Sequence, residues 1–271
     1  MTYPNFNLVL SGGAALGYAH VGVIKRLYEL DRFPQQIVGT SMGAIIGSVY
    51  ALKLPQEEFL RIFSEFSNIF KWIKISFSNA SLINSSKIYK ILESVFGEMK
   101  MAQSPIPLKL IATNFNNGEI RIFSRYDDIA IKDAILASMS IPVIFSQVKI
   151  DDAYYVDGYL GANLPLSYLD DTTILTIAVD VMGKNSLAPF VKEEYTFFGH
   201  TKAIIKTLER SMRLMMINQT KKTIEDFEGE LLLIEPHLHK FKSTHFNKFK
   251  KIKKAGYKSA YGAIAYPIAL K

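Results

Sequence analysis

The chain has 271 residues, of which 49% are hydrophobic and 21% charged, and it contains no cysteine. This size and composition predict one globular domain over residues 1–271 and exclude a disordered chain, a repeat array, disulfide bonds and a cysteine nucleophile. The net charge of +7 belongs to the C-terminal segment, because residues 236–271 carry nine lysines and no acidic residue.

Short apolar runs alternate with amphipathic runs along the chain, which indicates alternating strands and helices. The alternation predicts a three-layer α/β/α sandwich around a mainly parallel sheet. Ligands bind such sheets at the carboxyl ends of the strands, where two glycine-rich turns follow the first two predicted strands. The predicted strands are residues 6–10, 36–38, 108–113, 119–123, 173–180 and 231–235, and the predicted helices are residues 17–30, 42–52, 55–72, 85–96 and 132–140.

The first glycine-rich turn lies in LVLSGGAALG, residues 8–17. Successive N–H groups in such a turn form a concavity that binds anions, and the candidate donors here are Gly12, Gly13 and Ala14. An ordinary strand-to-helix turn and a phosphate loop are the alternatives. The phosphate loop is disfavoured because GxxxxGK[ST] is absent and Ala14 breaks GxGxxG.

The second turn, Gly39 to Gly43, fits the GxSxG pattern around Ser41. In this pattern the serine occupies a sharp strand-to-helix bend, and the flanking glycines Gly39 and Gly43 avoid the clashes that a Cβ would cause. The motif alone leaves two interpretations open, a nucleophile and a structural turn. Residues 33–52 are uncharged, but Pro34, two glutamines and several glycines favour a buried strand, turn and helix over a membrane span.

Two helical segments carry hydrophobic stripes at spacings of three and four. For the first stripe we expect core packing, with a lid or interfacial helix as the alternative. For the second we expect core or oligomer packing, with an acyl pocket lined by flexible methionines as the alternative. The first stripe comprises Phe59, Phe63, Phe66, Phe70 and Ile73, beside Trp72, and the second comprises Ile205, Leu208, Met212 and Met215.

Asp157 and Gly158 follow an aromatic, strand-like run in YYVDGYLGANLP. An acyl-transfer site needs a base for the nucleophile, and Asp157 is the candidate. Asp-Gly is also a leading signal of a type I′ hairpin turn, which is the alternative interpretation.

Four segments in this order resemble the patatin-like phospholipase family over about residues 7–166: LSGGAALGYAHVGVI, VGTSMGAI, ILASMSIPVIFSQVKIDDAYYVDG and VDGYLGANLP. The resemblance implies that Ser41 is the nucleophile and Asp157 the general base of a Ser-Asp dyad. It places the oxyanion hole at Gly12, Gly13 and the N–H of Ala14. It also implies hydrolysis of fatty acyl esters, commonly phospholipids or lysophospholipids, through an acyl-enzyme and without a metal or other cofactor.

The sequence departs from the family pattern beside these motifs. The family usually has a third glycine where Ala14 stands and a basic residue where Leu16 stands, and Tyr159 replaces a small residue after Asp-Gly. We expect Ala14 to keep its N–H in place through a negative φ. Leu16 leaves the head-group preference open, and Tyr159 narrows the site.

The histidines raise two questions, whether one of them completes a Ser-His-Asp triad and whether any of them binds a metal. His200, His237, His239 and His245 lie downstream of Ser41, so a Ser-His-Asp triad stays open. We interpret His20 as a structural histidine on the helix after the glycine turn. His237 and His239 lack an HExxH pattern or an acidic companion, and no metal site is expected.

The lysine-rich segment predicts a basic amphipathic helix over about residues 245–266, with Phe246, Phe249 and Ile252 among the lysines. Binding to an anionic membrane surface and docking on the core with a solvated lysine face are both open. Nucleic acid is not expected, because the rest of the chain is slightly acidic and has no recognition motif. A cytoplasmic protein with peripheral membrane association is the expected localisation.

The leading functional hypothesis is a serine lipid acyl hydrolase acting on phospholipid or lysophospholipid. The alternatives are an acyltransferase of related architecture and a non-catalytic lipid-binding protein.

Overall fold

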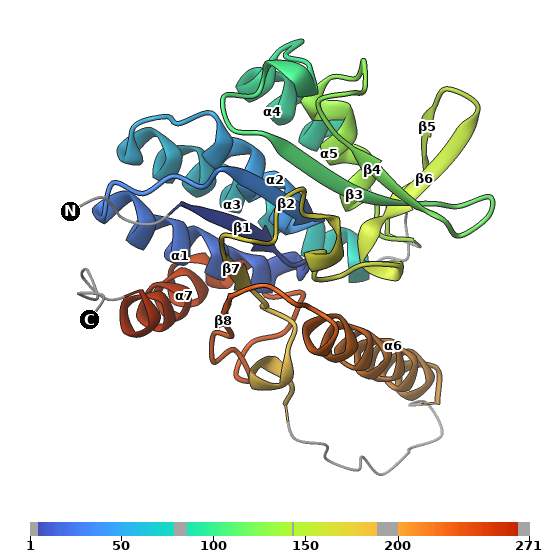
Figure 1. Cartoon of the computed structure of the whole chain (residues 1–271). Coiled ribbons are helices and arrows are strands. Elements are labelled where there is room, and N and C mark those ends of the chain that lie inside the picture. The colour runs from blue at the N-terminus through green and yellow to red at the C-terminus, as the bar shows by residue number, and fades with distance from the viewer. Residues whose placement is uncertain (1–4, 79–85, 143, 189–199, 265–271) are drawn as a thin grey trace.

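The centre of the protein is an eight-stranded sheet, seen in a computed structural model that describes residues 5–78, 86–142, 144–188 and 200–264 (Figure 1). The strand order is β5-β6-β3-β2-β1-β7-β8, and β4 pairs with β3. Strands β3, β2, β1, β7 and β8 are parallel, whereas β4, β5 and β6 pair antiparallel at one edge. The strands are β1 (Phe6–Leu10), β2 (Gln36–Thr40), β3 (Leu108–Asn114), β4 (Ile120–Phe123), β5 (Val148–Ile150), β6 (Ala153–Asp157), β7 (Leu175–Val179) and β8 (Leu231–Ile234).

The predicted helices are present, and α3 continues beyond its predicted end. The short strand β5 was not predicted, because its three residues place a lysine between two aliphatic residues and offer no extended pattern. The helices are α1 (Tyr18–Glu29), α2 (Met42–Ala51), α3 (Gln56–Ser78), α4 (Ser86–Phe96), α5 (Ile131–Met139), α6 (His200–Glu225) and α7 (Phe249–Ala263).

Both faces of the sheet are covered, which confirms the predicted sandwich. Leu8 and Leu10 of β1 belong to the larger core, together with residues of α1, α2, α3 and α5. Val9, between them, points to the opposite face, where it joins Leu164 and Leu166 in a smaller core that also contacts α6 near its end. Alternate residues of one strand thus enter two cores, as expected for a strand buried on both faces.

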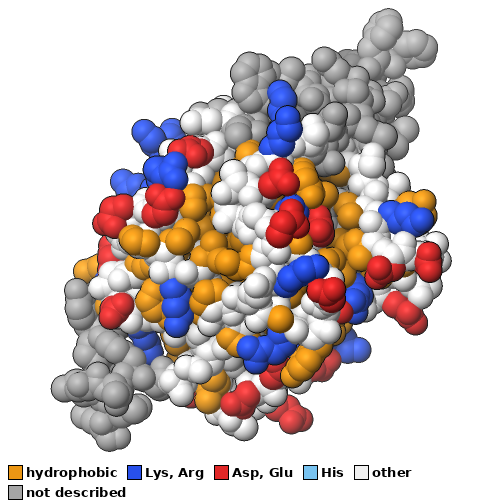
Figure 2. Space-filling view, turned by 90° about the horizontal axis from the view of Figure 1, so that it is seen from above, with side chains coloured by type: hydrophobic (Ala, Val, Ile, Leu, Met, Phe, Trp, Pro, Cys, Tyr) orange, Lys and Arg blue, Asp and Glu red, His pale blue; other side chains and the backbone are white. Residues whose placement is uncertain are grey.

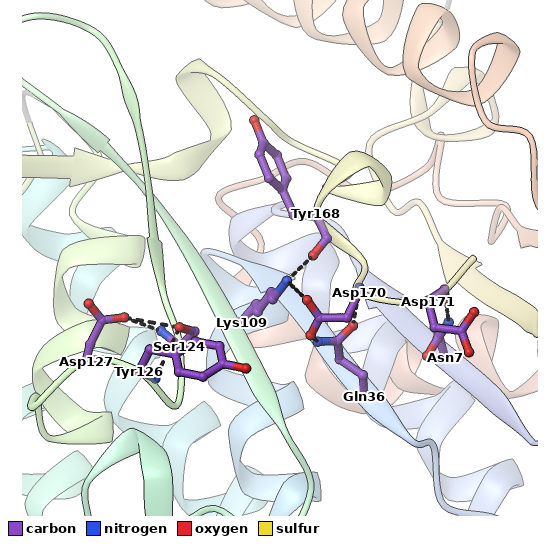
Figure 3. Close-up of polar contacts among 9 residues, drawn as sticks. All are labelled: Asn7, Gln36, Lys109, Ser124, Tyr126, Asp127, Tyr168, Asp170 and Asp171. Atoms are coloured by element: carbon purple, nitrogen blue, oxygen red, sulfur yellow. Dashed lines mark hydrogen bonds and ion pairs between the residues drawn. The ribbon is translucent and has the colours of Figure 1, made fainter. Parts of the chain in front are cut away.

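Polar contacts hold residues 168–171 against the amino ends of the parallel strands (Figure 3). Asn7 Nδ2 donates to Asp171 O at 2.6 Å, and Lys109 Nζ donates to Tyr168 O at 2.9 Å. Asp170 N donates to Gln36 Oε1 at 3.0 Å. Residues 168–171 are therefore fixed at the amino ends of the parallel strands, at the end of the sheet opposite the glycine-rich turns.

The lysine-rich helix α7 packs against α1 at very short range (Figure 1). A Cβ at Gly256 would lie 2.0 Å from Ala19 O, and a Cβ at Gly22 would lie 2.0 Å from Lys253 O. Phe249 and Ile252 are buried in the same contact. Docking on the core is thus confirmed, and the helix begins later than predicted because residues Phe246–Lys248 form a 3₁₀ turn.

The first hydrophobic stripe belongs to the core. Phe59, Phe63 and Phe66 are buried, as expected for core packing, whereas the side chains of Phe70, Trp72 and Ile73 lie outside the described residues. Residues 36–51 form β2 and α2 inside the fold, as predicted. Across the described ranges, every helix is too short or too polar to cross a membrane.

Candidate active site

Ser41 occupies the bend between β2 and α2 with a φ of 55° and a ψ of −120°. A positive φ is strained for a residue with a Cβ and is typical of functional turns. The flanking glycines are required by close approach: a Cβ at Gly43 would lie 2.4 Å from Leu10 O, and one at Gly39 would lie 2.8 Å from Gly43 O. The amino end of α2, which carries a partial positive charge, begins directly after Ser41.

The structure brings Ser41 and Asp157 into direct contact. Ser41 Oγ donates a hydrogen bond to Asp157 Oδ2 at 2.5 Å, and the two residues are 4% and 0% exposed. Asp157 ends β6 and caps a 3₁₀ turn (η3, Gly158–Leu160), where its Oδ1 accepts from Tyr159 N at 2.9 Å. The hairpin-turn interpretation of Asp157 and Gly158 is therefore wrong, because β6 leads into a 3₁₀ turn at Gly158 and pairs only with the preceding strands β3 and β5 in the described part of the chain.

Burial raises the pKa of Asp157 from its ordinary value to about 7, while the hydrogen bonds from Ser41 and Tyr159 oppose the shift. A carboxylate with a pKa near neutrality accepts a proton far more readily than an exposed aspartate. The Asp157–Ser41 pair thus has the geometry and the basicity that nucleophile activation needs.

Helix α5 supports both members of the pair, which was not predicted. Ser41 N donates to Ser138 Oγ at 2.9 Å, and Asp157 N donates to Ser140 O at 2.9 Å. Both serines lie in the family-like segment that begins ILASMS, and such a segment does not by itself indicate which turns it contacts.

The glycine turn lies beside Ser41, and its three backbone N–H groups differ in whether a hydrogen-bond acceptor already occupies them. Gly12 N donates to Asn163 O at 3.1 Å, so its N–H is already engaged, and Gly12 provides room rather than a free donor. For the N–H groups of Gly13 and Ala14 the described residues offer no hydrogen-bond acceptor. Ala14 has a φ of 45°, so the expected negative φ is wrong; Ala14 is strained in a conformation that the family's usual glycine adopts freely.

His20 is fully buried, and its Nε2 lies 2.9 Å from Ser11 O. Burial lowers the pKa of His20 to about 4, which keeps the ring neutral, as suits a structural histidine. His237 and His239 are exposed, whereas the side chain of His200 lies outside the described residues. In the part of the chain that is described, His, Cys, Asp and Glu side chains form no group of three that could hold a metal ion.

An apolar pocket of about 280 Å³ is lined in part by Tyr159, which lies two residues after Asp157 in the chain. One wall is the turn η3, and the other is the middle of α6. Met215 is 71% exposed at this site, and Gln219 Nε2 donates to Gly161 O. Ile205 and Leu208 of the predicted stripe have side chains outside the described residues. The lining residues are Tyr159, Leu160, Met212, Met215, Met216 and Gln219.

The sheet, the strained serine turn and the buried carboxylate together define an α/β protein with a GxSxG strand-turn-helix bend beside an aspartate. The family model of the patatin-like phospholipases matches residues 8–170, and the chain belongs to this family.

Sequence relatives match about two thirds or more of this chain. An "Uncharacterized NTE family protein" of Mycobacterium tuberculosis is 31% identical over 186 residues, which cover 68% of this chain and 51% of that protein. Triacylglycerol lipase 4 of Saccharomyces cerevisiae is 25% identical over 231 residues, covering 71% of this chain and 25% of the lipase. The chain thus spans about half the length or less of these curated relatives. The crystal structure of VipD from Legionella pneumophila shares the fold, with a TM-score of 0.53 at 15% identity, covering 97% of this chain and 67% of that one.

Proposed function

We propose that the protein is a serine lipid acyl hydrolase that cleaves fatty acyl esters of phospholipids or lysophospholipids through Ser41 and Asp157. The observation that carries the proposal is the 2.5 Å hydrogen bond from Ser41 Oγ to the buried Asp157 carboxylate. Membership of a family of phospholipases and the name of the yeast relative support a lipid ester as substrate.

The chemistry follows from this geometry. Ser41 Oγ attacks the ester carbonyl as its proton passes to Asp157 Oδ2, and the tetrahedral oxyanion forms near the free N–H groups of Gly13 and Ala14. Collapse of the intermediate breaks the ester bond, and the leaving alcohol takes the proton from Asp157. Water then attacks the acyl-enzyme, giving a proton to Asp157, which returns it to Ser41 as the fatty acid leaves.

The pocket beside Tyr159 is the proposed site for the acyl chain. Its walls are largely apolar. One of them is the turn η3, which Asp157, the proposed general base, caps. Its volume of about 280 Å³ lies near the lower end of ligand pockets, which suits one acyl chain better than two.

The test compares Ser41→Ala and Asp157→Asn with the wild-type protein on phospholipid, lysophospholipid and p-nitrophenyl esters. We expect each variant to lose about 10³-fold or more in kcat, because one lacks the nucleophile and the other lacks the base. Ser48→Ala is the matched control, since Ser48 is buried in α2 and its hydroxyl has no partner among the described residues. Circular dichroism checks folding. Full activity in well-folded Ser41→Ala or Asp157→Asn would falsify the dyad.

A further inference from the structure

Asn163 is a buried polar residue beside Ser41 that the mechanism above does not use. Its side chain is 2% exposed, and its Oδ1 has no hydrogen-bond partner within the described residues. A buried amide oxygen without a hydrogen-bond partner is unfavourable, so its presence in a native fold calls for an explanation.

The backbone of Asn163 already has a separate structural task. Its carbonyl oxygen accepts the hydrogen bond from Gly12 N at 3.1 Å and so joins the glycine turn to the segment that follows Asp157. This contact does not involve the side chain. A substitution at Asn163 therefore leaves this link between the two loops in place.

The side chain of Asn163 faces the same small space as Ser41. A Cβ at Gly12 would lie 2.9 Å from Asn163 Oδ1 and 3.3 Å from Ser41 Cβ, so the missing side chain of Gly12 leaves room between the amide and the nucleophile. Gly12 has donated its own N–H elsewhere, so its position next to Ser41 supplies space and no hydrogen bond. The Asn163 amide thus borders the space that Gly12 leaves open beside Ser41.

We propose that Asn163 is a further catalytic residue, whose side-chain amide hydrogen-bonds the ester oxygen as it becomes the oxyanion; this rests on the proposed acyl hydrolase function. A rotation about the last side-chain bond exchanges Oδ1 and Nδ2 and turns the donor toward that oxygen. The amide then adds a neutral donor to the N–H groups of Gly13 and Ala14. This role accounts for the lack of a hydrogen-bond partner for the Asn163 amide in the free protein, because the ester oxygen that it would bind arrives with the substrate.

The experiment compares Asn163→Ala and Asn163→Asp with the wild type, using kcat and KM on a p-nitrophenyl ester. We expect kcat to fall about 10²- to 10³-fold in Asn163→Ala with little change in KM, as for the loss of one oxyanion donor. Asn163→Asp keeps the shape but places an acceptor against the oxyanion, so its kcat falls further. If Asn163 only filled space, the shape-preserving Asp variant would be the milder one.

Two further measurements separate catalysis from folding. The rate at which an organophosphate p-nitrophenyl ester modifies Ser41 falls in parallel with kcat, because its phosphoryl oxygen occupies the same position. Thermal unfolding of Asn163→Ala matches that of Thr176→Ala, since Thr176 is also buried with an unpaired oxygen but lies within β7 away from Ser41. Thr176→Ala keeps its kcat.

The outcomes distinguish the two proposals. If the wild-type protein cleaves no ester and Ser41 is not modified, the hydrolase function itself fails. If the wild type is active and both Asn163 variants keep its kcat, or if Asn163→Asp is the more active of the two, the role of Asn163 is overturned while the dyad stands.

Discussion

At the scale of single residues, the surroundings of Asp157 determine what the site can do. An aspartate with its ordinary pKa near 4 is a weak base at neutral pH. Here complete burial raises the pKa to about 7, and the two hydrogen bonds it accepts prevent a larger rise. The carboxylate is therefore both ionised in part at neutral pH and basic enough to accept the proton of Ser41.

The first prediction follows from the direction of this shift. Because only the ionised form of Asp157 accepts a proton, kcat/KM for an ester without titrating groups rises about tenfold per pH unit below the pKa of about 7 and levels off above it. Initial rates between pH 5 and pH 9 measure the profile.

The control for this profile is Asp180, another buried carboxyl, whose pKa burial raises to about 6. Asp180 lies at the end of β7 and accepts from Met182 N at 2.8 Å. We expect Asp180→Asn to keep the titration near pH 7. A flat profile in the wild type, or one that disappears in Asp180→Asn, contradicts the assignment to Asp157.

At the scale of elements, α6 faces the active-site turn with methionines. Met212 and Met216 are half-buried there, and Met215 is exposed beside them. Long unbranched side chains of this kind adapt to a flexible apolar chain. Met212 and Met215 of the stripe thus line a pocket, and the proposed acyl chain would cover them there.

A second prediction concerns chain length. Met216→Trp fills the pocket, so the ratio of kcat/KM for a long-chain over a short-chain p-nitrophenyl ester falls about tenfold or more. Leu214→Trp is the control, because Leu214 is exposed on the same helix and does not line the pocket. An unchanged ratio in Met216→Trp would place the acyl chain elsewhere.

A third prediction concerns the contact between α1 and α7. Gly256→Ala puts a methyl group 2.0 Å from Ala19 O, which forces the helices apart and costs about 1–3 kcal/mol of stability. Gly262→Ala lies on the same helix with nothing within 4 Å and gains up to about 1 kcal/mol from helix propensity. Thermal unfolding compares the two variants; equal melting temperatures would contradict the close packing.

At the scale of the whole molecule, the features that could be predicted from sequence are local ones. Strand-turn-helix bends at Gly12 and Ser41 have distinct residue patterns. The alternation of strands and helices along the chain specifies the three layers of the sandwich. The support of Ser41 by Ser138 joins residues 97 positions apart, and the link from Gly12 to Asn163 spans an even longer stretch of the chain. Backbone carbonyls and helix-end serines make these contacts, and neither has a sequence pattern of its own.

The surface carries charge unevenly, which bears on how the protein would meet the lipid substrate proposed for it. Acidic and basic side chains are interspersed on the face shown in Figure 2. On α7 the exposed side chains include four lysines, and the helix has no acidic residue to offset them. Docking of α7 on α1 buries Phe249 and Ile252, so its exposed face would attract an anionic membrane mainly through its lysines.

The fourth prediction tests that attraction. Changing all four exposed lysines of α7 to glutamine lowers binding to anionic lipid vesicles at least about 100-fold at low salt, since each lysine near the surface contributes about 1 kcal/mol. Vesicle sedimentation measures the binding, and added salt weakens it in the wild type. Hydrolysis of a soluble p-nitrophenyl ester stays the same, because the lysines do not touch the dyad. The four are Lys250, Lys251, Lys254 and Lys258.

A matched variant shows whether vesicle binding depends on the lysines of α7 in particular or only on the net charge of the protein. Four exposed lysines on other elements change the net charge equally when replaced by glutamine but leave α7 intact, so vesicle binding falls far less. If both variants lose binding to the same extent, only the total charge matters, and α7 is not the contact surface. If neither loses binding, the protein reaches lipid through apolar groups such as those around Met215 instead. The control lysines are Lys53, Lys87, Lys90 and Lys149.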